Sequence, residues 1–282
     1  MLKRPEWLSK KISLGKCASL HNFLKGMDLH TVCREAMCPN ISECSSQGIA
    51  TILILGRTCT RNCAFCAVSK GRPLAPDRKE PLKVAKAVKK MDLSHVVVTS
   101  VTRDDVRDGG AAFFAETIKE IRKICPGTTV EVLVPDFLGI PSAIKKVVDA
   151  APDIFAHNLE TVPRLYTEAR QMADYSRSLD VIAEAKRVDS SMKTKSGIML
   201  GLGEKEEEVL ELFSDLRKAQ CDFISIGQYL APSLKHYKVA EYVHPDRFEF
   251  YKTRAEGLGF SHVESGPYVR SSYMASKYIA KK

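Results

Sequence analysis

The stretch that decides the fold is Thr51-Ile-Leu-Ile-Leu55, followed after three residues by Cys59-Thr-Arg-Asn-Cys-Ala-Phe-Cys66. A short, almost continuously apolar run is typical of a strand that is buried on both faces, as in parallel sheets. The cysteines follow this strand directly, so we expect them in the first loop after it. Loops at the carboxyl ends of parallel strands form the functional edge of such folds. The stretch therefore predicts an α/β fold with a cysteine loop at its mouth.

Outward from this stretch, the strand pattern recurs five more times toward the C-terminus. The further strands are predicted at His95–Ser100, Thr129–Asp136, Asp153–Glu160, Met192–Leu200 and Phe223–Leu230. Between them, apolar residues recur at helical spacing, for example Phe114, Ile118 and Ile121. This alternation predicts βαβ units with right-handed crossovers. Six units suit either a partial (β/α)6 barrel or a doubly wound open sheet, and periodicity alone does not separate the two.

The chain has no linker rich in Gly, Ser or Pro that would divide it into separate domains. We therefore expect one α/β core with an extension at each end. The predicted parts are an N-terminal extension at 1–48, a core at 49–256 and a C-terminal tail at 257–282.

Composition excludes several classes of protein. The 282 residues are 44% apolar and 27% charged, with a formal net charge of +9. The longest apolar stretch, Ile49 to Leu55, is too short to span a bilayer, and no secretory signal is expected after the basic start. We therefore predict a cytoplasmic protein that does not enter a membrane. The positive charge predicts acidic partners, but a nucleic-acid module is disfavoured because aromatic residues are only 7% and the pattern is a βα repeat.

The nine cysteines are unevenly distributed, and six of them lie within 34 residues. An odd number without an export signal argues against a disulfide framework, so the clustered thiols predict a metal site. The clustered six form two groups, which we name the loop triad (Cys59, Cys63, Cys66) and the N-terminal triad (Cys33, Cys38, Cys44). The scattered Cys17, Cys125 and Cys221 are expected to be small buried apolar residues.

The loop triad has the spacing C-x3-C-x2-C, which can wrap one corner of a [4Fe–4S] cluster. Such clusters normally take four thiolates, so a triad leaves one iron free to bind a reactive ligand. Phe65 is expected to shield the cluster from water. Zinc is the weaker alternative, because a structural zinc site needs four ligands in two spaced pairs.

The loop triad resembles the motif of the radical S-adenosylmethionine superfamily, C-x3-C-x-aromatic-C. The resemblance implies a partial (β/α)6 barrel of the TIM type. It also implies that the free iron binds the amino and carboxylate groups of S-adenosylmethionine. Reductive cleavage would then give a 5′-deoxyadenosyl radical that abstracts hydrogen from a carbon atom.

The N-terminal triad by itself is a weak signal that zinc or free thiols would also explain. Together with its neighbours, however, it resembles the lipoyl synthase family over nearly the whole chain. The motifs that carry the resemblance include Cys38-Pro39-Asn40-Ile41, Glu43-Cys44, Arg61-Asn62-Cys63, His157-Asn158-Leu159-Glu160, Thr194-Lys195-Ser196-Gly197 and Arg270-Ser271-Ser272-Tyr273.

This resemblance implies two [4Fe–4S] clusters and insertion of two sulfur atoms, at C6 and C8, into a protein-bound octanoyl-lysine. The N-terminal triad would hold the second cluster, with a fourth ligand from Ser271-Ser272, and Ser272 is preferred. A serine oxygen is a poorer ligand for such iron than a thiolate, which suits a cluster that is consumed as the sulfur source. The alternative is another radical sulfur-inserting enzyme, of the biotin synthase or methylthiotransferase type. That alternative would not account for the N-terminal triad together with the serine motif.

Five further residues are candidates for binding S-adenosylmethionine. Asn158 and Glu160 end the fourth predicted strand; by analogy they contact S-adenosylmethionine or the substrate, and strand-end solvation is the alternative. Gly201 ends the fifth strand beside Glu204, where glycine allows close approach of a ligand to the backbone. Lys195 is expected to face the same mouth and to pair with the methionine carboxylate.

The implied partners are octanoylated lipoyl-carrier domains of dehydrogenase complexes and the glycine-cleavage H protein, with an electron donor of ferredoxin or flavodoxin type. Neither nucleic acid nor membrane is expected as a partner. Lys70 to Lys90 carries eight basic and two acidic side chains. This run is either a solvated helix face or a docking surface for an acidic carrier beside the cysteine loop.

Overall fold

The central sheet contains seven parallel strands and one antiparallel edge strand within the part of the chain that the structure describes. The structure is a computed structural model that describes residues 3–9, 23–36, 38, 40–46 and 51–278. The parallel strands are β2 (Thr51–Ile54), β5 (His95–Ser100), β6 (Thr129–Leu133), β7 (Ile154–Ala156), β8 (Lys193–Leu200), β9 (Phe223–Gln228) and β10 (His262–Gly266). The order is β1-β2-β5-β6-β7-β8-β9-β10, and β1 (His30–Thr31) pairs antiparallel with β2.

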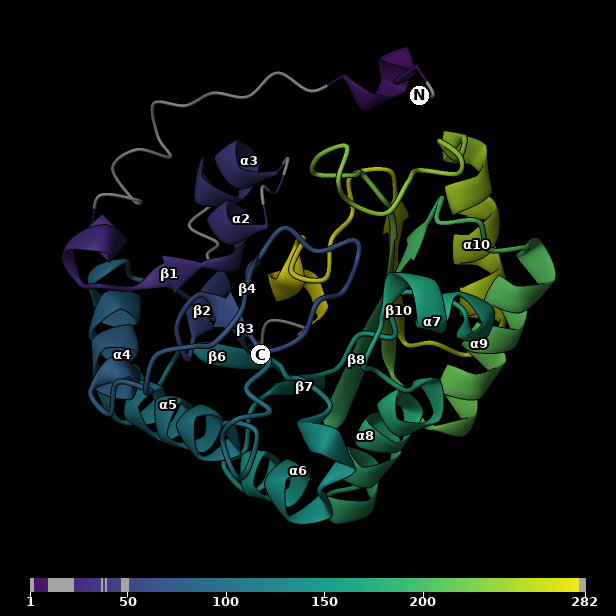
Figure 1. The fold of residues 1–282 in the computed structure, drawn as a ribbon. Coiled ribbons are helices and arrows are strands. Elements are labelled where there is room, and N and C mark those ends of the chain that lie inside the picture. The colour runs from purple at the N-terminus through teal and green to yellow at the C-terminus, as the bar shows by residue number, and fades with distance from the viewer. Residues whose placement is uncertain (1–2, 10–22, 37, 39, 47–50, 279–282) are drawn as a thin grey trace.

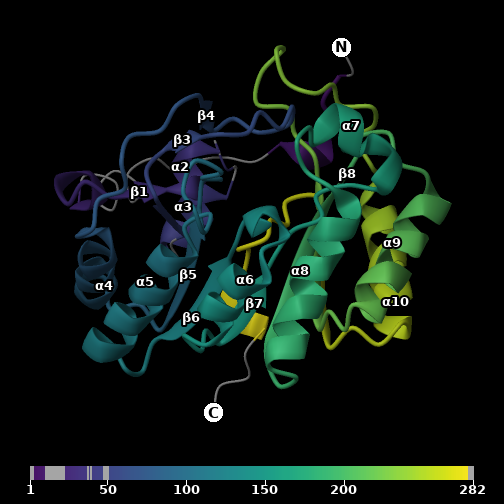
Figure 2. The same cartoon turned by 60° about the horizontal axis from the view of Figure 1, so that its bottom comes forward.

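Helices connect the parallel strands and cover the outside of the sheet (Figures 1 and 2). They are α4 (Glu80–Lys90), α5 (Ala111–Ile124), α6 (Pro141–Val148), α8 (Tyr175–Val188), α9 (Glu206–Lys218) and α10 (Pro245–Gly257). The sheet curves into a barrel wall but its two end strands, β1 and β10, do not pair. The parallel strands also follow one another in chain order, whereas a doubly wound sheet reverses its strand order at a switch point. The fold is therefore a partial barrel and not a doubly wound open sheet.

Shorter helices and strands lie outside the main α/β repeat. They are η1 (Glu6–Leu8), α2 (Val32–Glu35), α3 (Ile41–Ser46), β3 (Thr58–Cys59), β4 (Ser69–Lys70), η2 (Phe137–Gly139), η3 (Pro163–Leu165), α7 (Tyr166–Ala169) and η4 (Ala275–Tyr278). None of the helices in the described ranges is long and apolar enough to cross a bilayer.

The core forms where apolar strands meet the apolar faces of the helices. All four residues of β2 are buried, and Phe114, Ile118 and Ile121 of α5 are completely buried against the sheet. The α6 helix begins at Pro141, where the missing N–H costs no hydrogen bond. The helical spacing in the sequence therefore marked the packed faces correctly.

β6 and β9 end three and two residues earlier than predicted, and two other strands differ more. β7 ends at Ala156 rather than Glu160, because the chain leaves the ladder: Glu160 has a φ of 68° and makes only an isolated bridge to Ile198. β10 was not predicted, since His-Val-Glu-Ser-Gly lacks an apolar run, yet it pairs in parallel with β9 from His262 to Gly266. The predicted tail thus begins by adding a strand to the sheet.

After β10 the chain turns back into the barrel. We name residues 267–278 the tail segment; it ends in η4, and Figure 1 shows it inside the ring of strands. Ala275 is completely buried there. The end of the described chain therefore occupies the interior that a barrel of this kind offers.

Candidate functional site

The loop triad lies in a loop that is closed at its base. β3 and β4 pair in parallel on either side of it. The Gly71 amide donates to the Cys59 carbonyl at 3.0 Å, and Lys70 Nζ donates to the Cys63 carbonyl at 3.1 Å. The three cysteines are therefore presented by a short, braced segment.

Three neighbouring loops hold this segment at the carboxyl ends of the strands. The Thr60 amide and hydroxyl both donate to the Thr102 carbonyl after β5, at 3.1 and 3.0 Å. The Ala64 amide donates to the Ala169 carbonyl, and the Tyr237 amide donates to the Ala64 carbonyl, each at 2.9 Å. The prediction that the cysteines occupy the first loop at the mouth is confirmed by these contacts.

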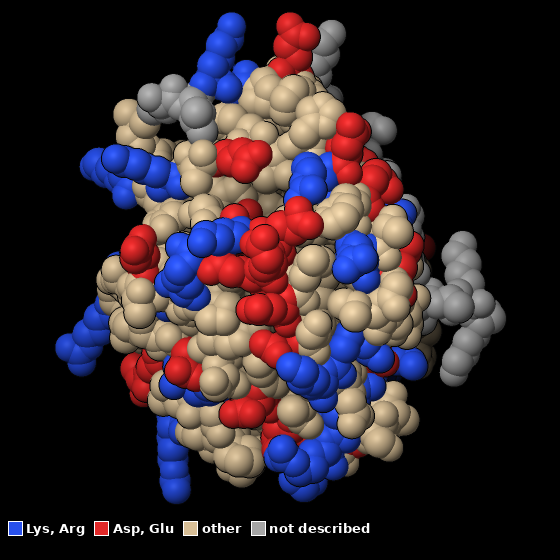
Figure 3. Space-filling model, turned by 90° about the vertical axis from the view of Figure 1, so that its right-hand side faces the viewer, with Lys and Arg blue, Asp and Glu red and all other residues tan. Residues whose placement is uncertain are grey.

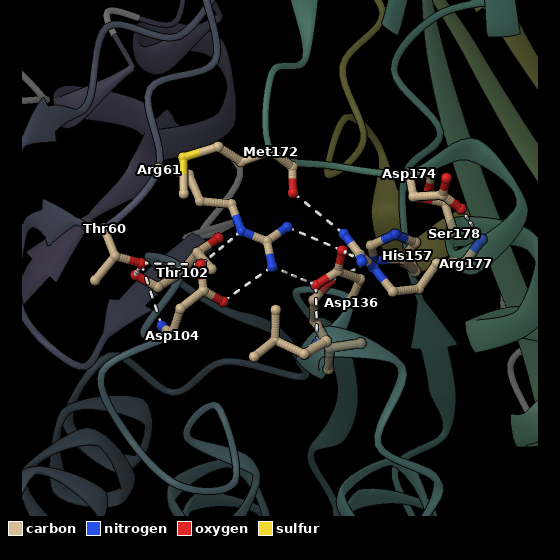
Figure 4. Close-up of polar contacts among 12 residues, drawn as sticks. Thr60, Arg61, Thr102, Asp104, Asp136, His157, Met172, Asp174, Arg177 and Ser178 are labelled. Atoms are coloured by element: carbon tan, nitrogen blue, oxygen red, sulfur yellow. Dashed lines mark hydrogen bonds and ion pairs between the residues drawn. The ribbon is translucent and has the colours of Figure 1, made fainter. Parts of the chain in front are cut away.

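Arg61 fixes the loop to two strand ends (Figure 4). It lies between Cys59 and Cys63, is only 5% exposed, and shares its guanidinium between two carboxylates. Nε and Nη2 donate to Asp104 at 2.7 and 2.9 Å, while Nη1 and Nη2 donate to Asp136 at 2.9 and 2.7 Å. Asp104 follows β5 and Asp136 follows β6, so one side chain joins three loops. Bidentate pairs of this kind combine strength with a defined orientation.

The charges in this network balance each other. Arg177 of α8 donates from Nε to Asp136 Oδ2 at 2.8 Å (Figure 4). Burial acts to raise the pKa of Asp136, but the Arg61 and Arg177 guanidinium groups outweigh it and hold that pKa well below its usual range. Burial disfavours the Arg61 charge, yet Asp104 and Asp136 raise its pKa above the ordinary value. Arg61 and Asp136 are therefore both ionised at neutral pH.

Next to this network, Arg170 lies beside His157 and interacts electrostatically with Glu160 and Cys63. Its Nη1 donates to the Tyr166 and Ser178 hydroxyls, each at 2.9 Å. Burial lowers the pKa of His157 to about 3, and Arg170 adds to that effect, so the imidazole is neutral. Burial raises the pKa of Glu160, while Arg170 acts in the opposite direction.

The thiols of the loop triad fit a cluster that supplies positive charge. All three are free and half-buried. Burial raises the pKa of Cys63, and it raises the pKa of Cys66 to about 11. Such thiols become thiolates when metal binding releases their protons. Three donors match a [4Fe–4S] cluster with one iron left open.

A single metal ion would require a different arrangement. Among the residues that the structure describes, no three His, Cys, Asp or Glu side chains form a group suited to holding one ion. A cubane does not need such a group, because each thiolate binds a different iron atom.

The N-terminal triad is built on two short helices. Cys33 lies on α2, Cys44 lies on α3, and Cys38 lies between them. The Cys38 amide donates to the Cys33 carbonyl, and the Cys44 amide donates to the Asn40 carbonyl, each at 2.9 Å. Burial raises the pKa of Cys33, and nearby Cys38 adds to it. Two adjoining short helices therefore carry Cys33 and Cys44, with Cys38 between them.

The tail segment contacts the helix that carries Cys44. Asn40 Nδ2 donates to the Tyr268 carbonyl at 2.5 Å, and the Tyr273 hydroxyl donates to Glu43 Oε1 at 3.0 Å. Tyr268 and Tyr273 flank the serine pair in the sequence. The structure thus brings the serine pair and the N-terminal triad to neighbouring positions, although they are far apart along the chain.

The same segment also contacts the end of β7. The Ser271 hydroxyl donates to Asn158 Oδ1 at 2.6 Å, and Asn158 Nδ2 donates to Glu160 Oε1 at 3.0 Å. A Cβ at Gly197 would lie 2.9 Å from both Asn158 Oδ1 and Ser271 Oγ, so glycine permits this approach. The Ser272 hydroxyl forms no hydrogen bond to the described residues.

Other predicted site residues make contacts within the protein. Phe65 is half-buried and packs against the apolar cluster beneath β8 and β9. The Glu204 carboxylate accepts from the amides of Gly201 and Leu202 at 2.5 and 2.9 Å, so it shapes the turn after β8. A Cβ at Gly201 would lie 2.3 Å from Gln228 Nε2, so the close approach there is made by Gln228.

Lys195 does not lie at the mouth, so the expectation that it faces the mouth and pairs with the methionine carboxylate is wrong. It lies near the amino-terminal end of β8, is completely buried, and its Nζ donates to Glu131 Oε1 at 3.0 Å. The physical reason is that a lysine this early in the strand faces the opposite half of the barrel, where Glu131 compensates its charge.

Comparison with known proteins agrees with this fold and site. Residues 53–216 match the family description "Radical SAM superfamily". The barrel resembles that of Streptococcus suis SuiB bound to S-adenosylmethionine, with a TM-score of 0.60 and 11% identity over 86% of this chain and 57% of that chain. It also resembles methylornithine synthase, with a TM-score of 0.55 and 14% identity over 77% and 71% of the two chains.

Two curated relatives are much closer in sequence. A lipoyl synthase of Caldicellulosiruptor saccharolyticus is 55% identical over 98% of this chain and 97% of its own length. A lipoyl synthase of Geobacter metallireducens is 54% identical over 99% and 98% of the two chains. The fold and the loop triad define a radical S-adenosylmethionine enzyme. Within that superfamily, the chain belongs to the lipoyl synthase family.

Sequence reasoning missed several residues that organise the site. The sequence pattern identifies Arg61 only as part of a motif and Asp136 only as the end of a predicted strand. Arg170, Glu43 and Tyr273 were given no role of their own. A charged residue between two cysteines, with carboxylates after the next two strands, was the signal available for the Arg61 network. The contact between Tyr273 and Glu43 spans 230 residues, so no local pattern could reveal it.

Proposed function

We propose that this chain carries out the lipoyl synthase reaction, inserting sulfur at C6 and C8 of an octanoyl group attached to a carrier-protein lysine. The observation that supports this most is a continuous path of neighbours between the two triads. The path runs through Cys63, Glu160, Asn158, Ser271, Tyr273, Glu43 and Cys44. A radical source and a sulfur source must both reach the same alkyl chain, and this path supports the proposal that the two triads serve one reaction.

The two triads take different roles in this proposal. Each holds one [4Fe–4S] cluster, and the loop triad leaves one iron for S-adenosylmethionine. When bound, these groups supply a 5′-deoxyadenosyl radical at the loop triad and sulfur at the N-terminal triad. The protein residues hold the groups, orient them and exclude water.

Ser272 is the proposed fourth ligand at the N-terminal triad. The neighbouring Ser271 hydroxyl donates to Asn158 at 2.6 Å and is thereby oriented toward β7. Ser272 makes no such contact with the described residues, which leaves its hydroxyl free to bind metal. An oxygen ligand among thiolates is the weakest bond of the set, so it would open first.

Asn158 and Glu160 remain candidates for contacting S-adenosylmethionine or the alkyl chain. The Glu160 carboxylate acts to raise the pKa of Cys63, and Arg170 acts to lower the pKa of Glu160. Gly201 and Glu204 belong to the turn after β8, at the same edge of the sheet. Phe65 packs beside the loop triad and would limit the access of water to it.

The carrier domain is proposed to dock on the segment that follows the loop triad. We name residues 70–79 the rim segment. Its basic residues are all exposed: Lys70, Arg72, Arg78 and Lys79. Its one acidic residue, Asp77, pairs with Lys83 at 2.9 Å, and Leu74 is 89% exposed. An octanoylated, acidic lipoyl-carrier domain would match this charge.

The later lysines of α4 do not belong to this surface. The helix starts at the rim segment and ends just before His95, at the amino end of β5. Lys86, Lys89 and Lys90 therefore lie toward the opposite end of the barrel. On the face formed by α9 and α10, acidic and basic side chains are interspersed (Figure 3), so that face offers no comparable basic surface.

The cellular setting and the reductant follow from the same chemistry. We propose the cytoplasm as the setting, because clustered cysteines that hold metal suit a reducing compartment. The cluster at the loop triad needs single electrons at low potential, which a ferredoxin or flavodoxin would supply.

The experiment that tests the proposal compares one cysteine from each triad. The chain and the variants Cys63→Ala and Cys44→Ala are reconstituted anaerobically and given S-adenosylmethionine, reductant and an octanoylated carrier domain. Cys63→Ala should form no 5′-deoxyadenosine. Cys44→Ala should lose about half of the iron and still form 5′-deoxyadenosine, but no lipoyl product. Lipoyl product from Cys44→Ala would refute the proposed role of the N-terminal triad.

A further inference from the structure

The buried Lys195–Glu131 pair is not used by the reaction proposed above. Lys195 Nζ lies 3.0 and 3.3 Å from the two Glu131 carboxylate oxygens, and both side chains are buried. His95, the first residue of β5, has its Nε2 3.8 Å from Glu131 Oε2. The pair thus lies toward the amino-terminal ends of the strands, whereas the loop triad lies at their carboxyl ends.

The third partner of this pair is the last described residue of the tail segment. Lys195 Nζ lies 3.7 Å from the centre of the Tyr278 ring. The ring is 6% exposed and packs against His262 and Phe223, with centroid distances of 4.7 and 5.4 Å. A cation over an aromatic face is attracted most strongly when both are removed from water.

The ring of Tyr278, and not its hydroxyl, makes this contact. The Tyr278 hydroxyl is buried without a hydrogen-bond partner among the described residues. A buried polar group without a partner is unfavourable, so the tyrosine is not held there by its oxygen. Packing and the cation therefore account for its position.

The tail segment is consequently held at two points inside the barrel. Near its start, Ser271 donates to Asn158 at the end of β7. At its end, Tyr278 sits on Lys195 at the opposite half of the barrel. Ser272 immediately follows the first of these points and precedes the second.

We infer that Lys195 and Tyr278 form an anchor that keeps the tail segment in the barrel and thereby positions Ser272. Lys195 is then a positioning residue for the N-terminal triad and does not contact S-adenosylmethionine. This inference rests on the proposed role of Ser272 as a metal ligand. Without the anchor, the tail segment would leave its place more often, and the serine oxygen would dissociate with it.

The test compares Tyr278→Phe with Tyr278→Leu in the full-length chain. Phenylalanine keeps the ring and removes only the unpartnered hydroxyl, so it is the matched control. Leucine fills space without an aromatic face. Both are made also in a background with Cys59→Ala, Cys63→Ala and Cys66→Ala, in which the N-terminal triad is the remaining cluster site. The measurement is the rate of iron release to a chelator.

We expect Tyr278→Phe to release iron at the rate of the parent chain. Tyr278→Leu should release it about 30-fold faster, since loss of a desolvated cation–π contact of about 2 kcal/mol corresponds to that factor. The double variant Lys195→Met with Glu131→Gln should behave like Tyr278→Leu. In chains with an intact loop triad, 5′-deoxyadenosine formation should stay unchanged in all of them.

A second measurement keeps the anchor testable if the N-terminal triad holds no cluster. Hydrogen exchange of the tail-segment amides is followed in the metal-free chain, where Tyr278→Leu should exchange faster and Tyr278→Phe should not. Equal exchange and equal iron release for Tyr278→Leu and the parent would overturn the anchor. If Tyr278→Phe and Tyr278→Leu accelerated iron release and amide exchange equally, the aromatic ring would not be the basis of the anchor. A parent background that binds no iron would instead contradict the proposed function of the triad.

Discussion

Arg61 shows how one side chain between two cysteines can organise a site. It forms four hydrogen bonds to Asp104 and Asp136, and these carboxylates follow β5 and β6. Because the guanidinium is planar, its position sets the orientation of the loop as well as its distance from the strands. A lysine would keep the charge but could not form bidentate pairs with the two carboxylates.

We therefore predict that Arg61→Lys lowers 5′-deoxyadenosine formation by about 100-fold, since small displacements of a reacting centre have effects of that size. Iron bound at the N-terminal triad should stay unchanged. The control is Arg164→Lys, because Arg164 forms a similar bidentate pair with Glu208 at the surface. Activity of Arg61→Lys equal to that of the control would show that the network does not position the loop.

His95 predicts a pH dependence of stability. Burial lowers the pKa of His95 to about 4 from 6.5, and Lys195 adds to this, while Asp153 opposes it; Glu131 also faces the ring. The folded state then binds the proton more weakly than the unfolded state, so the free energy of unfolding falls as the pH drops below 6.5. Between that pH and pH 5 the loss should be about 2 kcal/mol.

Urea unfolding of the metal-free chain at several pH values measures this slope. His95→Asn removes the titrating ring and can still hydrogen-bond Thr129, so its slope should be smaller over this range. His236→Asn, at a half-exposed position after β9, serves as the control. An unchanged slope in His95→Asn would mean that other groups cause the pH dependence.

Among the helices and strands, the sequence predicts those whose formation depends on their own residues. The apolar strands and the amphipathic helices followed from periodicity, and the cysteine loop followed from its place after β2. The sequence pattern does not predict the polar strand β10, because this strand depends on pairing with β9 and not on its own residues. The position of the tail segment inside the barrel is also not predictable from local sequence, because it contacts Asn158 and Lys195, which are distant in the chain.

The rim segment gives a prediction about docking. Reversal of charge in Arg72→Glu, Arg78→Glu and Lys79→Glu together should raise the Michaelis constant for an octanoylated carrier domain by about tenfold at low salt. A short octanoyl-lysyl peptide should be affected much less, because it does not cover the rim. Added salt should have the same effect as the substitutions, since exposed charges are screened beyond about 8 Å at physiological salt.

The matched control reverses three exposed lysines on the outer helices, Lys86, Lys89 and Lys119. That variant should keep the Michaelis constant of the parent. Equal effects of the two triple variants would show that only net charge matters. Equal salt sensitivity for the domain and the peptide would mean that the rim segment is not a docking surface.

At the scale of the whole molecule, the open side of the partial barrel gives the end of the chain access to the barrel interior. Because β1 and β10 do not pair, the chain after β10 can fold into the interior and reach the N-terminal triad. The partial barrel therefore brings residues from both ends of the chain into contact. This arrangement leads to the central claim, that the protein carries its own sulfur source beside its radical source.

The most direct test of that claim follows the sulfur itself. The chain is reconstituted with iron and ³⁴S-labelled sulfide, freed of unbound sulfide, and given an octanoylated carrier domain, S-adenosylmethionine and reductant in unlabelled buffer. We predict that the lipoyl group formed carries the heavy isotope at both sulfur positions by mass spectrometry. A lipoyl product with unlabelled sulfur would contradict the account, because the sulfur would then come from outside the protein.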